Sequence, residues 1–400
     1  MANCIFCGTL LDGQTKPEHV LLDALGGRKT TTQIICSKCN STFGGGIDKI
    51  LAEQFQVVRN LLQLESGTGR PAPTRKKVRV GTDVVNIHGD GTLELASKPF
   101  TLSVLPDGGI DVQITARSLE HFEQLIPHIA AAVGVSEEEF RSQLPFEKFR
   151  YIQRRPGMAN ESFSFGGHEA FRSAAKACLI LWALKVGRDE VSSLYYAHAR
   201  DFVVSGSEDF LRSRTALDAR LVDITGEMRA AYGPIFNLIY IRSNSEGRVV
   251  AHFTFYNIIG FQIVLAESGG LADKFVALVS NPIIPSDWSD KAGDIFNINF
   301  DWLDRPEYYD ILDKQRERFA SLMDVYYDIA TQRSIKNISD KVFVKYDLGD
   351  DDPIPGDLQD QIISELGARL AAHALDFPYE EPVPDEVLRS LMQHRCPKSE

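Results

Sequence analysis

The chain has 400 residues and a formal net charge of −12, with 44% hydrophobic and 24% charged residues. This composition is typical of an ordinary globular protein, and the length predicts two or three domains with buried cores. Six cysteines in a chain of this length exclude a disulfide-rich scaffold.

The sequence contains no apolar run of the length that a membrane span requires. The longest obvious run, residues 177–184, lies between Lys176 and Lys185. No apolar segment precedes Cys4, so no signal peptide is expected. We therefore expect a cytoplasmic protein without a membrane partner, whose cysteines stay reduced.

The charge is distributed unevenly along the chain. Residues 1–80 carry eleven Lys and Arg against six Asp and Glu, a net charge of +5, whereas the remainder carries −17. A basic N-terminal part attracts polyanions, so DNA is a candidate partner of this part. The basic cluster in it is equally consistent with a solvated linker; its residues are Arg75, Lys76, Lys77 and Arg79.

Two Cys-x-x-Cys pairs stand near the start of the chain, namely Cys4 with Cys7 and Cys36 with Cys39. A two-residue gap lets both sulfurs of a pair face one ion, and Zn²⁺ takes four such ligands in tetrahedral geometry. Four thiolates close the coordination sphere, so this zinc is expected to be structural and any chemistry must occur elsewhere. The alternative is a redox dithiol, which does not need two matched pairs.

Glu18 and His19 stand side by side between the two cysteine pairs. Residues 33–35 are predicted to form a short strand that leads into the second pair. From residue 46 to residue 64 apolar side chains recur at helical spacing, which predicts one long helix. In this layout Asn40, directly after the last cysteine, can face His19.

These motifs resemble the HNH endonuclease family, in its zinc-bearing ββα-metal form. The resemblance is confined to the N-terminal part and rests on Cys4-x-x-Cys7, Glu18-His19-Val20, Gly26-Gly27 and Cys36-x-x-Cys39-Asn40. It implies that His19 is the general base that activates a water for attack on phosphorus. It also implies that Glu18 and Asn40 are ligands of one catalytic Mg²⁺ or Mn²⁺ ion, distinct from the zinc. Asp48 is a further candidate ligand, although a carboxylate at a helix start more commonly caps the helix.

The chemistry of these residue types is consistent with the implied roles. An imidazole with a pKa of about 6.5 is sufficiently deprotonated at neutral pH to accept a proton from water. Carboxylate and amide oxygens are ligands that Mg²⁺ and Mn²⁺ accept, and such a cation neutralises charge on phosphoryl oxygens. The alternative for His19 is a surface histidine beside a glutamate.

The sequence departs from the family pattern at two positions. Leu22 stands three residues after His19, where the family usually has a proline. The middle asparagine of the family, which orients the histidine ring, falls near Thr31. A threonine hydroxyl or a backbone carbonyl is then left to orient His19, and the alternative is a slow or inactive nuclease.

The predicted fold class is α+β, with an HNH module stapled by zinc at residues 1–65 and a larger mixed region after it. Residues 66–76 are rich in Gly and Pro and are expected to be a linker. Residues 77–155 are predicted to form a small β-rich unit of antiparallel strands with one helix, from residue 118 to residue 133.

Residues 156–400 are predicted to form a larger α+β domain that acts in recognition or sensing. Within it we expect a buried helix at 171–186, because that segment is apolar on nearly all sides. Antiparallel strands are expected at 235–241 and 249–265, around a turn, and a long charged helix at 307–333.

Three functions are consistent with the sequence. The first is a metal-dependent DNA endonuclease, for which a role in restriction or anti-phage defence follows only by analogy of layout. The second is a zinc-stapled module that binds DNA without cutting it, and the third is a zinc domain for protein interaction. The ligand or protein partner of the C-terminal domain and the existence of a homo-oligomer are left open.

Overall fold

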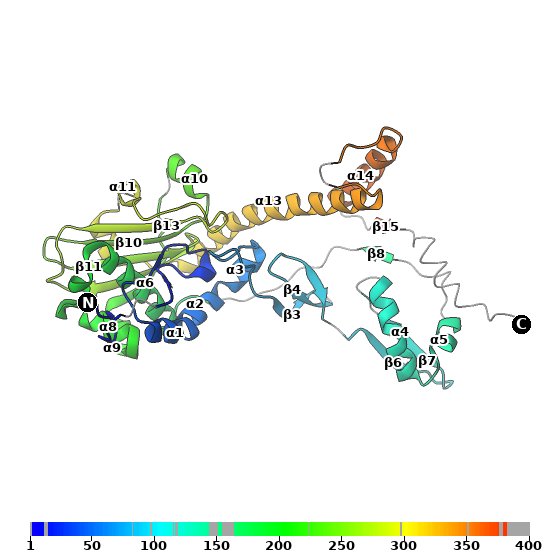
Figure 1. The fold of residues 1–400 in the computed structure, drawn as a ribbon, viewed down its shortest axis with the longest axis horizontal. Helices are drawn as coiled ribbons and strands as arrows, with labels where there is room; N and C mark the ends of the chain where they lie inside the picture. Colours follow the sequence, from blue (N-terminus) through cyan, green and yellow to red (C-terminus); the bar gives the residue numbers. More distant parts are fainter. Residues whose placement is uncertain are drawn as a thin grey trace, which may run out of the picture. The chain divides into compact units, whose positions relative to one another are not determined.

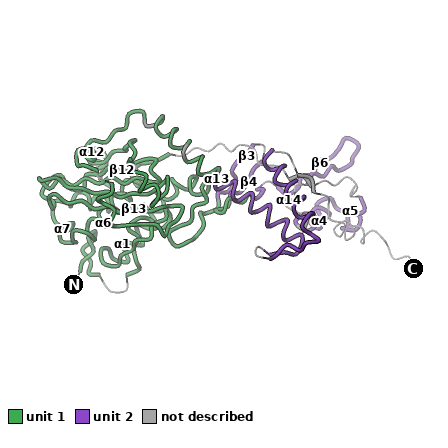
Figure 2. Tube along the Cα trace, turned by 90° about the horizontal axis from the view of Figure 1, so that it is seen from above, with its two compact units in different colours: residues 1–74, 88–92, 161–327 green, residues 75–87, 93–160, 328–400 purple. Residues whose placement is uncertain are grey.

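The computed structural model describes residues 2–11, 15–81, 83–96, 98–114, 116, 119–143, 151–153, 164–223, 225–296, 298–349, 352–375 and 379–381. The chain forms two compact units (Figure 2). Unit 1 comprises residues 1–74, 88–92 and 161–327, and unit 2 comprises residues 75–87, 93–160 and 328–400. Both units combine helices with antiparallel strands, which confirms the predicted α+β class.

Unit 1 is built around a six-stranded antiparallel sheet with the strand order β14-β13-β10-β11-β12-β9 (Figure 1). The strands are β9 Thr215–Asp218, β10 Asn237–Ser243, β11 Val249–Phe255, β12 Ile259–Ala266, β13 Phe275–Ser280 and β14 Trp288–Ser289. The predicted hairpin is confirmed, because β10 and β11 pair around the turn that ends at Gly247. The single strand expected at 249–265 is wrong: Tyr256 and Asn257 adopt positive φ and divide it into β11 and β12.

Helices cover both faces of this sheet. α6 (His168–Val186) lies against β10 to β13, which confirms the predicted buried helix. α11 (Gly293–Phe296) and α12 (Phe300–Asp304) pack on the opposite face. Alternate residues of β10 enter the two cores, Ile239 beneath α6 and Leu238 beneath α12. Because both faces are covered, β11 and β12 are buried along their whole length.

A histidine is enclosed in the core beneath α12. His252 of β11 is fully buried, and neither of its ring nitrogens has a hydrogen-bond partner. Its Nδ1 lies 3.6 Å from Oδ2 of Asp218, which is itself paired with Arg220 at 2.6 Å. Its ring packs edge-on against Trp302, with 5.0 Å between the ring centroids. Burial lowers the pKa of His252 to about 4, although Asp218 acts to raise it.

The buried His252 is expected to make the protein less stable in mild acid. The unfolded chain protonates this histidine below pH 6.5, whereas the folded chain does so only near pH 4, so stability falls as the pH falls through this window. Between pH 7.5 and pH 5 this single proton lowers the free energy of unfolding by about 2 kcal/mol. Urea denaturation of the wild type and of His252→Phe across this range measures it. Equal pH slopes in the two proteins would contradict the prediction.

The N-terminal part of unit 1 is a small hairpin followed by three short helices. Its elements are β1 Glu18–His19, η1 Asp23–Leu25, β2 Thr30–Thr31, α1 Ser37–Gly45, α2 Ile47–Gln54 and α3 Gln56–Leu61. The strand predicted at 33–35 is wrong, because the amide of Gln33 donates to Oγ1 of Thr31 and the chain turns after β2. The single helix predicted at 46–64 is also wrong: Phe55 leaves helical geometry and separates α2 from α3, and α3 ends at Leu61.

The core of this N-terminal part is continuous with the core beneath α6. Phe55, which separates α2 from α3, is fully buried, with its ring 4.8 Å from the rings of both Phe165 and Phe255. Leu21 and Leu51 belong to the same cluster, and α2 packs along α6. Apolar packing therefore fastens the N-terminal part to the sheet independently of any metal.

Shorter helices complete unit 1. They are α7 Arg188–Ser192, η3 Leu194–Tyr196, α8 Ala197–Ser205, α9 Glu208–Arg214 and α10 Gly226–Tyr232. The charged helix predicted at 307–333 exists but is displaced and longer, since α13 runs Ile311–Lys345 and continues into unit 2.

Unit 2 contains two small antiparallel sheets before α4, where the sequence predicted antiparallel strands in one small unit. Its strands are β3 Arg75–Val80, β4 Asp83–Ile87, β5 Leu93–Leu95, β6 Phe100–Val104, β7 Ile110–Ile114, β8 Tyr151–Gln153 and β15 Tyr379–Glu381. Its helices besides the end of α13 are α4 Leu119–Val133, α5 Glu137–Gln143 and α14 Gln359–Ala374. The start predicted for α4, residue 118, lies outside the described residues. Among the described residues, no helix combines the length and apolar character needed to cross a bilayer.

Candidate functional site

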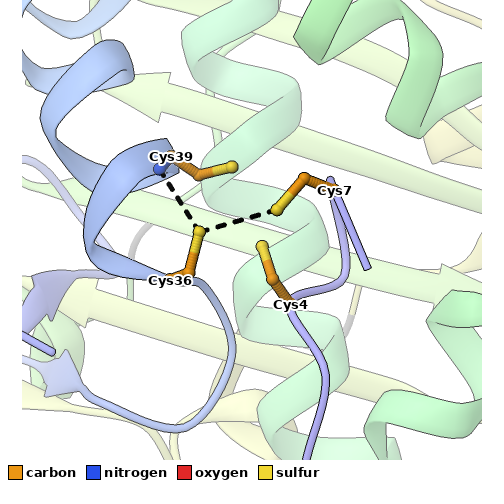
Figure 3. Close-up of side chains that lie close together, drawn as sticks. All are labelled: Cys4, Cys7, Cys36 and Cys39. Carbon is orange, nitrogen blue, oxygen red and sulfur yellow. Dashed lines mark hydrogen bonds between the residues drawn. The ribbon is translucent and has the colours of Figure 1, made fainter. Parts of the chain in front are cut away.

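The four cysteines of the two Cys-x-x-Cys pairs converge on one point (Figure 3). Their sulfur atoms all lie within 4.8 Å of one another, and the Sγ atoms of Cys7 and Cys36 are 3.5 Å apart. Cys36 is the N-cap of α1 and Cys39 lies in its first turn, so the helix N-terminus favours thiolates there. Burial and the neighbouring Cys4 raise the pKa of the Cys39 thiol, because a thiolate in this crowded cluster has no counter-charge. A cation at the centre of the cluster would supply that charge. This donor set fits a structural zinc with a closed coordination sphere.

The two-stranded hairpin carries the predicted acid and base at adjacent positions of β1. Glu18 pairs with Thr31 and His19 with Thr30. Glu18 is buried, whereas the side chain of His19 is 27% exposed. The hydroxyl of Thr31 accepts a hydrogen bond from the backbone of Gln33, so it is engaged locally rather than with His19.

A cavity of about 620 Å³ is lined by all four residues that the sequence predicted for the catalytic site. Glu18 and His19 reach it from β1, Asn40 from α1 and Asp48 from α2. The side-chain amide of Asn40 donates to the carbonyl of Lys16 at 3.0 Å, which leaves Oδ1 as the atom that would meet a cation. The same cavity is also lined by charged side chains that the sequence did not predict as site residues, among them Asp23, Arg59, Arg70 and Lys176.

Lys176 of α6 is a buried cation between two of the predicted metal ligands. Its ammonium donates to the carboxylate of Glu18 and, at 2.5 Å, to Oδ2 of Asp48. The hydroxyl of Ser173, one turn earlier in α6, donates to Oδ1 of Asp48 at 2.6 Å. Burial acts to lower the pKa of Lys176, but the two carboxylates raise it overall, so the side chain stays charged.

The pair Glu18 and Asp48 therefore fits a cation in charge and in donor type. One ammonium balances at most one of the two carboxylates, although burial raises the pKa of Glu18, and their oxygens are of the hard type that Mg²⁺ and Mn²⁺ prefer. A divalent ion at these carboxylates would have Lys176 as its neighbour or its competitor. The expected helix-capping role of Asp48 is not its main contact, because Asp48 bonds to Lys176 and Ser173 of another helix.

Asp23 stands beside His19 and connects it to a surface arginine. Its Oδ1 lies 3.8 Å from Nε2 of His19, and its Oδ2 accepts a bond of 2.7 Å from Arg70. The amide of Thr68 holds the same carboxylate at 2.8 Å. Burial lowers the pKa of His19 although Asp23 acts to raise it, so the imidazole is neutral at pH 7. A neutral imidazole is the form that accepts a proton.

Residues 4–56 match the family model described as HNH endonuclease. The N-terminal part of this chain is similar to HNH endonucleases over these residues and is named the HNH module for that resemblance. The match begins at Cys4, the first cysteine of the four-sulfur cluster, and ends at the start of α3. It includes both Cys-x-x-Cys pairs, Glu18-His19 and Asn40. No curated protein and no solved structure matches the chain.

The signal for Lys176 was present in the sequence but not sufficient to identify it. Lys176 stands at the start of the apolar run of α6, and a lysine there has to be paired when that part of the helix is buried on all sides. Its partners are 158 and 128 residues away in the chain, and no periodicity connects such distant positions. Arg59 and Arg70 lie beyond the motif region and carry no characteristic spacing.

Proposed function

We propose that the HNH module is a metal-dependent endonuclease that hydrolyses phosphodiester bonds of DNA. The observation that carries the proposal is the cavity in which a neutral His19 lies with Glu18, Asn40 and Asp48. The family match supports nuclease chemistry in general, and the basic charge of residues 1–80 supports a polyanionic partner. The restriction or anti-phage role stays an analogy of layout.

In this proposal His19 acts as the general base. Its neutral ring accepts the proton of the attacking water, and the carboxylate of Asp23, 3.8 Å from Nε2, stabilises the resulting imidazolium. Asp23 thereby takes the positioning role for which sequence analysis considered Thr31. Glu18 and Asn40, with Asp48 as a third donor, are proposed to hold a Mg²⁺ or Mn²⁺ ion. When bound, that ion supplies neutralisation of charge on the phosphoryl oxygens.

A second candidate is a zinc-stapled module that binds DNA without cutting it. The observation in its favour is the ammonium of Lys176, which already occupies the contact position of Glu18 and Asp48. A lysine between Glu18 and Asp48 pairs with both carboxylates but supplies no Lewis acid. The two candidates differ only in whether cutting accompanies binding.

His19→Ala is expected to lower DNA cutting by about 10²–10⁴-fold, the contribution usual for a general base. Supercoiled plasmid is incubated with the wild type and the variant, with Mg²⁺ or Mn²⁺ added or omitted. Omission is preferable to a chelator, because a chelator also attacks the zinc site. His198→Ala, a change at an exposed histidine of α8, is the matched control and is expected to cut like the wild type.

Gel retardation without added Mg²⁺ or Mn²⁺ separates the alternatives. Wild-type protein that shifts the plasmid but does not cut it with either ion favours the DNA-binding candidate. Cutting that persists in His19→Ala removes the proposed base and with it the mechanism.

A further inference from the structure

Arg59 is the only charged side chain lining the cavity that has no partner there. The cavity wall, all of which lies in the described part of the chain, carries four cations and four carboxylates: Lys49, Arg59, Arg70, Lys176, Glu18, Asp23, Asp48 and Glu53. Three of the cations form ion pairs that use all four carboxylates: Lys176 with Glu18 and Asp48, Arg70 with Asp23, and Lys49 with Glu53. The positive charge of Arg59 is left over.

The isolation of Arg59 is not relieved by exposure to solvent. The residue is 4% exposed, and its Nε is buried without a hydrogen bond. Across the described residues, its guanidinium forms neither an ion pair nor a hydrogen bond. The hydroxyl of the neighbouring Tyr256 is also without a hydrogen bond, so it does not satisfy the guanidinium. Asp23 also acts electrostatically on Arg59, but it is already engaged by Arg70 and Thr68.

A buried guanidinium without a counter-ion destabilises a fold. Arginine does not escape the cost by losing its proton, because it stays charged in proteins. Paired or hydrogen-bonded surroundings are the rule for buried charges. A cavity that keeps such a residue against its wall is suited to an anion that arrives from outside.

We propose that Arg59 binds a phosphate group of a nucleic acid backbone in this cavity. The proposal rests on the proposed function, since His19 lines the same cavity and would act on the phosphodiester held there. The planar fork of a guanidinium matches two phosphate oxygens at once, which an ammonium does not. Arg70, whose side chain is 76% exposed, adds positive charge at the cavity for the neighbouring backbone.

Binding of DNA without cutting tests the proposal. The affinity for a short fluorescein-labelled duplex is measured by fluorescence anisotropy, without added Mg²⁺ or Mn²⁺ and over a series of salt concentrations. Arg59→Met is expected to weaken binding by about 10–100-fold, as for loss of a hydrogen-bonded charge pair. The number of counter-ions released on binding, given by the slope of log affinity against log salt concentration, is expected to fall by about one in this variant. Arg59→Lys keeps the charge but not the planar fork, so its duplex affinity is expected to lie between those of the wild type and Arg59→Met. Arg70→Met changes a paired arginine of the same cavity and is expected to lose less affinity than Arg59→Met.

Thermal unfolding separates ligand binding from a structural role. In phosphate-free buffer Arg59→Met is expected to be at least as stable as the wild type, because an uncompensated buried charge has been removed. Inorganic phosphate is expected to raise the Tm of the wild type and not that of Arg59→Met. A variant that loses stability in phosphate-free buffer and binds phosphate and duplex like the wild type would overturn the proposal.

The outcomes distinguish this inference from the proposed function. Duplex binding that depends on Arg59 in a protein that never cuts DNA refutes hydrolysis and keeps the phosphate site. Cutting that depends on His19, with duplex affinity unchanged in Arg59→Met, refutes the phosphate site and keeps hydrolysis. An Arg59-dependent response to inorganic phosphate without any affinity for the duplex overturns the assignment of the ligand to nucleic acid.

Discussion

Replacing Lys176 with methionine is expected to lower the free energy of unfolding by about 3–5 kcal/mol, the range for breaking a buried ion pair from one side. The Lys176 side chain is 1% exposed and pairs with two carboxylates, Glu18 and Asp48, that are themselves largely buried. Methionine fits the volume but leaves both carboxylates without their counter-ion. Urea denaturation followed by circular dichroism measures the change.

Two further variants show whether the loss comes from the charges. Lys185→Met removes another lysine of α6, whose partner Asp290 lies 3.0 Å away near the surface, and is expected to cost less than about 1 kcal/mol. The double variant Lys176→Met/Glu18→Gln is expected to regain part of the loss, because one of the unpaired carboxylates has been removed. Additive effects of the two substitutions would argue against direct coupling between these side chains.

Replacing Cys36 with serine is expected to remove the zinc. One ion per chain is expected in the wild type by elemental analysis and close to none in the variant, since three thiolates with a poor fourth ligand bind zinc far more weakly. Without the metal, the segment that carries the first Cys-x-x-Cys pair, residues 4–11, is expected to become sensitive to protease. Isolated zinc fingers unfold entirely without metal. Here α6 and the sheet are expected to survive, because the HNH module shares their apolar core.

Cys178→Ala is the matched control for the zinc prediction. Cys178 is a buried cysteine of α6 that takes no part in the four-sulfur cluster. Its replacement is expected to leave the zinc content unchanged and to cost only the packing of one sulfur atom. Full zinc occupancy in Cys36→Ser, or equal loss in both variants, would contradict the assignment of the metal site.

Local patterns in the sequence predicted those features that depend on neighbouring residues. The Cys-x-x-Cys spacing identified the sulfur cluster, and the uninterrupted apolar stretch identified α6. The breaker-rich turn before β11 identified the hairpin. Each of these features is fixed by residues only a few positions apart, or by a motif whose two halves are both visible.

Features set by tertiary packing were not predictable in this way. Phe55 satisfies helical spacing, yet the helix is interrupted there, and its ring packs against both Phe165 and Phe255. Lys176 was visible only as the polar boundary of an apolar run. Asp23 stands four residues after His19, but its orientation beside His19 depends on hydrogen bonds from Thr68 and Arg70. Both of these residues lie after the predicted end of the module at residue 65.

The continuous core has a consequence for protein engineering. A fusion that carries residues 1–65 alone would look complete by its motif. Such a chimera would leave Lys176 behind and would bring two acidic side chains into a host that has nothing to neutralise them. It would also expose the apolar face that α6 covers. Any transplant of this HNH module has to include α6, the helix that carries Lys176.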